Sequence, residues 1–119
     1  MKQYIGNIGQ KALDNINYRE VLYTGPKMQL VVMSLDPGEE IGEEIHADHD
    51  QLLNFISGEG KAVLDGALHD LKEGDAVIVP AGMRHNIINT SSGRELKLYT
   101  IYAPPEHKPG TLQPRKRDA

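Results

Sequence analysis

Cysteine is absent from this 119-residue sequence, and its absence excludes several classes of function at once. The chain has no disulfide framework, no thiolate nucleophile and no cysteine-based zinc site. Long apolar runs are missing as well. No window approaches the roughly 18 apolar residues of a membrane-spanning helix, and the first twenty residues lack the apolar segment of a signal peptide. We therefore expect a cytoplasmic protein with no membrane partner.

Positive charge is also in short supply. The chain has 13 Lys and Arg against 17 Asp and Glu, a net charge of −4 and a pI of about 5.7. Binding to a phosphate backbone needs a basic face, so we expect no nucleic-acid partner. The one basic run, Arg115 to Arg117, falls in the last five residues. It is typical of a solvated tail.

What the sequence does have is the composition of one globular domain, expected to span residues 1–119. Hydrophobic residues make up 39% and charged residues 25%. Its 12 glycines and 7 prolines are spread along the whole chain. This distribution of turn-forming residues is typical of many short strands joined by turns.

The hydrophobic pattern predicts an all-β sandwich or barrel, with helix only at the N-terminal end, over residues 8–15. Asp65-Gly66 predicts a tight hairpin turn, and residues 39–46 are expected to be extended and unusually acidic. Strands are predicted over residues 19–24, 28–35, 52–56, 61–65, 67–71, 76–79, 85–89 and 95–102.

Two segments carry residues suited to a metal site. Side chains at i and i+2 of a strand share a face, so Glu44 and His46 project together. Gln51 and His85 begin the inward faces of two later strands. Such a mixed nitrogen and oxygen set suits divalent iron, manganese, nickel, cobalt or zinc rather than calcium. From spacing alone, the two histidines are equally well explained as ordinary polar residues.

The second of these segments contains a specific motif. Residues 74–89 read G-x5-P-x-G-x2-H-x3-N, with Gly74, Pro80, Gly82, His85 and Asn89 at the fixed positions. In this respect the chain resembles the cupins, which are small β-barrels. It is most similar to the single-domain, type-2 cupins often called phosphomannose-isomerase-like.

The first cupin motif, G-x5-H-x-H-x3,4-E-x6-G, is matched with two departures. Gly38, His46 and Gly58 occupy their usual positions. Glu44 stands where the first histidine is usual, and Gln51 stands where the glutamate is usual. These departures put the identity of the metal and the charge balance of its site in doubt.

The resemblance implies a double-stranded β-helix, or jelly-roll barrel, with its core over about residues 28–103. It also implies a homodimer, in which residues 1–27 would contribute by adding a strand to a neighbouring sheet. Residues 104–119 are expected to be a polar tail. The implied metal ligands are His46, His85, Gln51 and Glu44. Two alternatives stay open: Glu44 as a solvated edge residue like Glu43, and Gln51 as a buried amide that orients a histidine.

Other polar residues near the motifs are given lesser roles. Asp48, His49 and Asp50 are expected on a loop at the barrel mouth. His69, on the hairpin, and His107, in the tail, are expected to be exposed and remote from the site. Asn89 and Gly82 are expected to be structural, through backbone hydrogen bonds and turn geometry.

The function that follows is a metal-binding cupin with a small-molecule ligand or substrate. A metal-dependent enzyme acting on a small polar molecule is favoured, either as an isomerase of sugars or hydroxy-carbonyl compounds or as a dioxygenase. The alternative is a non-catalytic module that binds a small molecule or a metal, because this fold hosts both kinds of protein.

Overall fold

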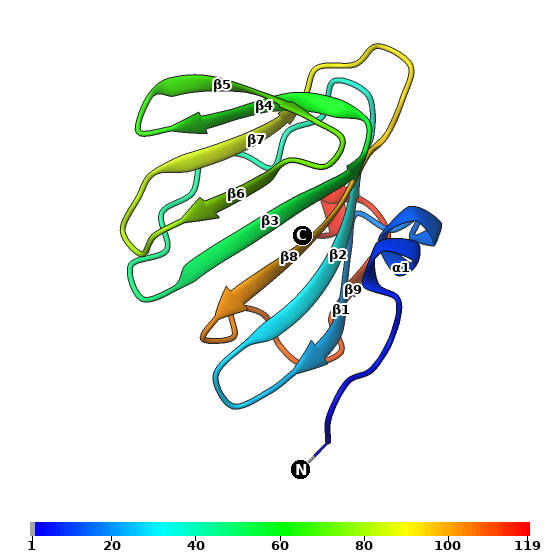
Figure 1. Cartoon of the computed structure of the whole chain (residues 1–119), viewed down its shortest axis with the longest axis vertical. Coiled ribbons are helices and arrows are strands. Elements are labelled where there is room, and N and C mark those ends of the chain that lie inside the picture. Colours follow the sequence, from blue (N-terminus) through cyan, green and yellow to red (C-terminus); the bar gives the residue numbers. More distant parts are fainter. Residues whose placement is uncertain (1) are drawn as a thin grey trace.

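The computed structural model describes residues 2–119, which form mostly antiparallel β-structure (Figure 1). One α-helix precedes the strands and a single 3₁₀ turn, η1, follows them. The elements are α1 (Ile8–Asp14), β1 (Arg19–Thr24), β2 (Gln29–Leu35), β3 (Asp50–Ser57), β4 (Glu59–Leu64), β5 (Ala67–Lys72), β6 (Ala76–Val79), β7 (His85–Asn89), β8 (Leu96–Ala103), β9 (Leu112–Gln113) and η1 (Lys116–Asp118).

The strands form two facing sheets, which confirms the predicted jelly-roll class. The large sheet has the order β6-β3-β8-β2-β1-β9, and the small sheet has the order β5-β4-β7. Every strand pair is antiparallel. The acidic segment before β3 runs beside β7, where Glu40 bridges Ile88 and Glu44 bridges His85. This segment extends the small sheet and brings its first-motif residues to the second motif.

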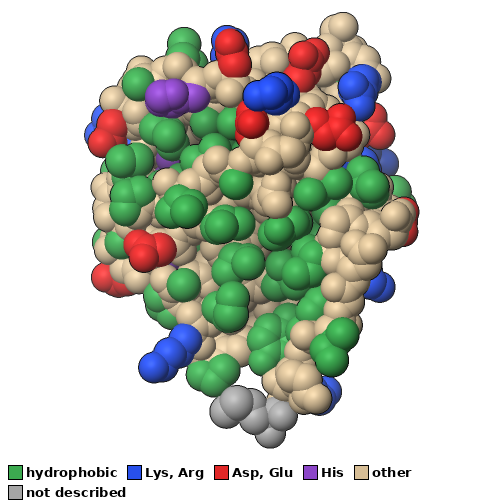
Figure 2. Space-filling model, in the orientation of Figure 1, with side chains coloured by type: hydrophobic (Ala, Val, Ile, Leu, Met, Phe, Trp, Pro, Cys, Tyr) green, Lys and Arg blue, Asp and Glu red, His purple; other side chains and the backbone are tan. Residues whose placement is uncertain are grey.

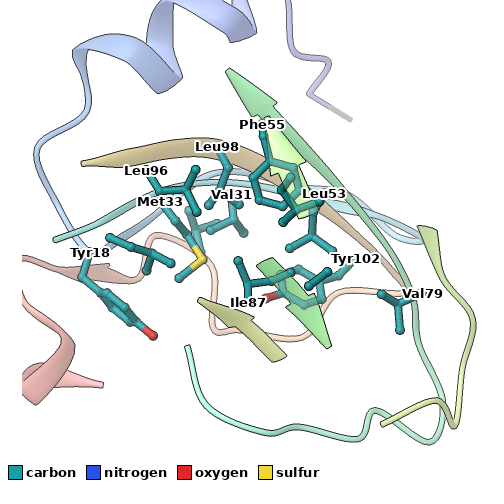
Figure 3. Close-up of a cluster of buried hydrophobic side chains, with 14 residues drawn as sticks. Tyr18, Val31, Met33, Leu53, Phe55, Val79, Ile87, Leu96, Leu98 and Tyr102 are labelled. Carbon is teal, nitrogen blue, oxygen red and sulfur yellow. The ribbon is translucent and has the colours of Figure 1, made fainter. Parts of the chain in front are cut away.

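The core lies between the two sheets, because alternate residues of the main strands point inward. In β3 these are Gln51, Leu53 and Phe55, as the sequence predicted. Figure 3 shows Leu53 and Phe55 of the large sheet pointing into the same interior as Ile87 of the small sheet. The strand β2 is buried along its whole length, because α1 packs on the outer face of the large sheet.

Two residues of the motifs fix the course of the backbone. Asn89 is fully buried, and its Nδ2 lies 2.8–3.1 Å from the carbonyl oxygens of Leu35, Asp36 and Arg94. Its Oδ1 accepts a hydrogen bond from the amide of Ser91 at 3.0 Å. Asn89 therefore ties the end of β7 to the turns before β3 and β8, which confirms its predicted structural role.

The second of these residues is Gly58, between β3 and β4. Its φ of +99° lies in the region that favours glycine. A Cβ there would come within 2.5 Å of the carbonyl oxygen of Glu95. The glycine therefore lets β4 turn away from β3 while the chain before β8 passes close by.

The Asp65-Gly66 hairpin is also confirmed, with φ values of 48° and 84° at these two residues, as a type I′ turn requires.

The predicted helix near residues 8–15 and the predicted strands are confirmed, with shifts of one or two residues at several ends. The largest shifts are at the start of β3, which begins at Asp50 instead of Leu52, and at the start of β4, which begins at Glu59 instead of Lys61. In the N-terminal segment, residues 8–27 hold α1 and β1, and β1 pairs with β2 and with β9. The addition of a strand to a neighbouring sheet by this segment stays a prediction, and its first residue lies outside the described residues.

The C-terminal segment differs most from the prediction of a free polar tail. Arg115 and Arg117 are exposed as expected, but β9 pairs with β1, and η1 adds helical structure outside the N-terminal end. The fully buried Gln29 also holds the chain just after β8. Its Oε1 accepts hydrogen bonds from the amides of Glu106 and His107 at 3.1 and 2.9 Å, and its Nε2 donates to the carbonyl of His107 at 2.7 Å.

Among residues 2–119, no helix is long and apolar enough to cross a membrane.

Candidate metal centre

His85 is the first residue of β7, and its ring is fixed by the turn that precedes it. Gly82, with a φ of +87°, allows that turn, and its amide donates to the carbonyl of His46 at 2.9 Å. The His85 Nδ1 lies 3.0 Å from the carbonyl oxygen of Met83. Because a carbonyl only accepts, Nδ1 carries the proton and Nε2 keeps its lone pair. That Nε2 is buried and has no hydrogen-bond partner.

Glu44 and His46 are brought to His85 by backbone pairing. The amides and carbonyls of Glu44 and His85 exchange two hydrogen bonds of 2.8 and 2.9 Å. Glu44 and His46 then project together, while Ile45 between them is 55% exposed. One potential ligand atom from each of Glu44, His46 and His85 lies within 4.8 Å of the others. The His46 and His85 ring centroids are 5.2 Å apart.

Gln51 lies at the start of β3 with its amide held in one orientation. Its Nε2 donates to Thr100 Oγ1 at 3.0 Å, and Thr100 in turn donates to the carbonyl of Leu52 at 2.8 Å. The Gln51 Oε1 is consequently left buried with no partner. Gln51 is also the cross-strand partner of Tyr102, whose ring lies edge-on to His46 at 5.8 Å. This pairing places the buried Gln51 on the same inner face as Tyr102.

The donor set fits a divalent transition metal. Buried polar atoms in folded proteins are nearly always paired, yet His46 Nε2, His85 Nε2 and Gln51 Oε1 are all unpartnered acceptors. With the Glu44 carboxylate they offer two nitrogens and two oxygens. Imidazole nitrogen with carboxylate or carbonyl oxygen is a set that suits first-row divalent metals. The side chain of Glu44 is 35% exposed, so the centre opens toward solvent on its side.

Glu106 is a site residue that the sequence did not point to. It reaches the centre from the C-terminal segment that Gln29 holds in place. Its Oε2 lies 3.4 Å from Nδ1 of His46 and 3.3 Å from Nε2 of His49. His49 Nε2 also lies 3.0 Å from the carbonyl oxygen of Pro105. A lone glutamate after two prolines carries no local signal of this contact, because the contact depends on how the tail returns.

The sequence also predicted the exposure of several polar residues near the motifs, and the structure confirms some of these predictions but not all. His69 is exposed on β5, as predicted. Asp48 and Asp50 are exposed before and at the start of β3, and Asp50 accepts a hydrogen bond from the amide of Ala81 at 2.9 Å. The prediction for His107 was wrong.

His107 packs against the buried Tyr102, with ring centroids 5.3 Å apart, and its Nε2 is buried without a partner. Burial and the positive charge of Arg19 lower the pKa of His107 to about 4, so its ring is neutral at pH 7. Burial raises the pKa of Tyr102 well above its ordinary value, so the phenol stays protonated. Neither His107 nor Glu106 could be recognised from the sequence, because their contacts form only when the C-terminal segment folds back and is held by Gln29.

Comparison with known proteins agrees with this architecture. The sequence pattern of the family described as "Cupin domain" matches residues 31–102. The chain is 43% identical over 116 residues to the uncharacterized protein L612 of Acanthamoeba polyphaga mimivirus, which covers 95% of this chain and 72% of the relative. It is 40% identical over 124 residues to the uncharacterized protein YrkC of Bacillus subtilis strain 168, which covers 99% of this chain but only 66% of the relative.

Among solved structures, the crystal structure of BH2720 from Bacillus halodurans superimposes with a TM-score of 0.95 at 36% sequence identity. The superposition covers 98% of this chain and 92% of that one. The likeness therefore includes the N-terminal helix and the C-terminal segment as well as the two sheets.

Proposed function

The chain belongs to the cupin domain family, and we propose that it is a metal-dependent enzyme that acts on a small polar molecule. The proposed ligands of the metal are His46, His85, Glu44 and Gln51. The observation that carries the proposal is the set of three buried acceptors, on His46, His85 and Gln51, that have no hydrogen-bond partner in the protein. The Glu44 carboxylate lies 3.8 Å from His46 Nε2, so it faces the same space. A divalent iron, manganese, nickel, cobalt or zinc ion would satisfy all three acceptors.

Bound there, the metal would supply Lewis-acid catalysis for an isomerase or, as iron or manganese, the redox chemistry of a dioxygenase. The protein's own residues would hold the centre and handle protons. His85 is oriented by its Nδ1–H bond to Met83. His46 has the Glu106 carboxylate at its other ring nitrogen. Partners of this kind fix the orientation of a ligating imidazole and raise its basicity.

An isomerase also needs a group that takes a proton from one substrate carbon and returns it to another. Glu106 and His49 supply a candidate pair, because they contact one another at 3.3 Å with side chains that are 28% and 19% exposed. Glu106 also contacts His46, whose side chain is 11% exposed, so this pair is more accessible to solvent than the proposed metal ligand beside it. General acid–base groups need this combination of solvent access and proximity to the reacting molecule.

The metal is tested by elemental analysis of protein purified without chelators or nickel resin. We expect about one divalent ion per chain, and its loss in His46→Ala and in His85→Ala. His69→Ala is the matched control, because this exposed imidazole should leave the metal content unchanged. Metal content in His46→Ala equal to that of the native protein would show that the ligand assignment is wrong.

The non-catalytic alternative is a module that holds a metal or small molecule without turnover. Oxygen uptake and carbonyl isomerisation can be assayed on the metal-loaded protein with panels of sugars and hydroxy-carbonyl compounds. Turnover that is abolished in His46→Ala favours the enzyme. Stable metal binding with no turnover of either panel favours the binding module.

We also propose that residues 1–119 act as one cytoplasmic domain and that two copies associate through the outer face of the large sheet. Apolar side chains that are exposed or partly exposed lie in register on this face: Ile78, Leu52, Ile101 and Tyr23, with the buried Leu30 between the last two. Figure 2 shows hydrophobic side chains gathered over the middle of the molecule, where Figure 1 places these strands. Apolar patches of this extent mark protein interfaces more often than free surface.

Light scattering after size-exclusion chromatography tests the dimer. We expect a mass of twice 13.2 kDa for the native chain. Ile78→Glu, at a side chain that is 69% exposed on β6, should shift the protein toward the monomer. Leu68→Glu is the matched control, because Leu68 is 64% exposed but belongs to the small sheet. A native mass of 13.2 kDa would refute the dimer.

A further inference from the structure

Arg19 is a buried cation without an anion of its own. The residue is 6% exposed at the start of β1, and its cross-strand neighbour Met33 is in the core. Its Nη1 donates to Gln113 Oε1 at 2.6 Å, but its Nε is buried with no partner. None of the ion pairs formed by residues 2–119 involves Arg19. Burying an unpaired charge is costly, so such a residue normally has an opposite charge beside it.

The acidic residues nearby are already engaged. Glu44 lies with His46 and His85, and Glu106 contacts both His46 and His49. Once Glu44 holds a metal, neither carboxylate is available to Arg19. Arg19 contacts two neutral residues: Gln113 satisfies one nitrogen of the guanidinium, and the Tyr18 ring lies under it with the centroid 5.1 Å from Cζ. The Nε edge therefore remains open for an acceptor that the protein does not supply.

Arg19 also faces the interior that holds the histidine centre, because it lies two residues before Val21 on the buried face of β1, and Val21 belongs to the same buried cluster as Tyr102. The charge of Arg19 opposes the burial-driven rise in the pKa of Tyr102 and adds to the fall in the pKa of His107. The Tyr102 ring contacts the rings of both His46, at 5.8 Å, and His107, at 5.3 Å. His107 Nε2 is a second buried polar atom without a hydrogen-bond partner. Arg19 and His107 thus each bring one unsatisfied polar atom to the interior that contains Tyr102.

We propose that Arg19, together with His107, binds an oxyanionic group, a carboxylate or a phosphate, of the molecule that reaches the His46 and His85 centre. The Nε edge of a guanidinium suits such an anion, because its parallel N–H groups match two oxygens. The neutral His107 ring adds one N–H donor. The substrate class is then an anionic small molecule. This inference rests on the proposed function, because the other end of the same molecule would reach the metal held by His46 and His85.

The test uses the full chain with its metal removed, so that anion binding is measured apart from metal binding. Titration calorimetry at constant ionic strength compares acetate, inorganic phosphate and, as an uncharged match for acetate, acetamide. We expect saturable binding of acetate or of phosphate, which identifies the kind of anion, and none of acetamide. Arg19→Met should weaken the binding at least tenfold, while Arg19→Lys should weaken it less because it keeps the charge.

Two control variants separate anion binding from other roles of Arg19. Arg94→Met removes an exposed cation, and Gln113→Ala removes the contact between Arg19 and the tail. Both should bind the anion as the native protein does. Equal loss in Gln113→Ala and Arg19→Met would show that Arg19 only tethers the tail, and would overturn the proposal. So would equal binding by Arg19→Met and the native protein.

If Arg19→Met does not fold, the native protein still decides the matter. The Nε–H resonance of Arg19 should shift on addition of the anion that binds, and an unmoved resonance overturns the proposal. A failure of this inference is also distinct from a failure of the metal assignment. The first is seen as no anion binding in the metal-free protein, and the second as no metal in the protein as purified.

Discussion

Replacing Glu106 by glutamine should weaken metal binding without unfolding the protein. The carboxylate Oε2 lies 3.4 Å from His46 Nδ1, on the side of the ring away from the proposed metal-binding Nε2. Glutamine keeps the size of the side chain but removes its charge. The imidazole is then held less firmly, and its Nε2 becomes a weaker donor to a metal.

The expected size of the effect follows from the geometry. Loss of a partner behind a metal ligand typically costs about 10- to 100-fold in metal affinity. The 3.4 Å separation is longer than a strong charge-assisted hydrogen bond, and the Glu106 side chain is 28% exposed. Both features place the effect at the lower end of that range. We expect about tenfold, which corresponds to about 1.4 kcal/mol.

Metal affinity is measured by competition with a chelator, using zinc or manganese and metal-free protein. Glu43→Gln is the matched control, because Glu43 precedes Glu44 but points to Arg84 at 3.2 Å. Glu106→Asp should recover part of the affinity. The melting temperature of the metal-free protein should be similar for all variants, since a merely structural role would change that quantity instead. A Glu106→Gln affinity within twofold of the native value would refute the reasoning.

Two further predictions concern stability. Asn89→Ala should lower the free energy of unfolding by about 3 kcal/mol, because it leaves several buried backbone groups without a partner. Urea unfolding measures this, with Asn86→Ala, on the partly buried side of the same strand, expected to cost less than half as much. Acidification should destabilise the native protein between pH 6.5 and about 4, because His107 is neutral when folded and takes up its proton more readily when unfolded. His107→Gln should flatten that part of the stability profile in unfolding experiments at several pH values, and an unchanged profile would show that His107 does not contribute.

Most of the fold could be predicted because its signals are local. Strand alternation placed Gln51, Leu53 and Phe55 on one inward face, and the turn residues marked where strands end. The motif around His85 could be predicted for the same reason. Its fixed positions follow from one turn and one strand, and the resemblance then linked them to Glu44 and His46. The pairing of these segments across β7 is what the structure adds.

The C-terminal contribution could not be predicted, because its contacts depend on residues distant in sequence. Glu106 and His107 are held by Gln29, some 77 and 78 residues earlier. A polar segment after two prolines has the composition of a solvated tail, and nothing in its spacing indicates docking. The available signals were indirect: Arg19 and Gln29 are polar residues at positions of β1 and β2 that the structure buries. Each has a hydrogen-bond partner in the tail: Gln113 for one nitrogen of Arg19, and Glu106 and His107 for Gln29.

The buried atoms that lack partners argue for one ligand spanning both parts of the site. Within residues 2–119 there are five such atoms, on Arg19, His46, Gln51, His85 and His107. Unrelated packing defects would be scattered through the fold, but these residues gather around Tyr102. Its ring meets the rings of His46 and His107 edge-on, it pairs with Gln51 across the strands, and the charge of Arg19 acts on its pKa, while the centroids of the His85 and His46 rings are 5.2 Å apart. Because three of the five suit a metal and the other two suit an anion, a molecule that chelates the metal at one end and carries an oxyanion at the other would satisfy them together. An anionic hydroxy-carbonyl compound has this chemistry, and such compounds are the first substrates to assay.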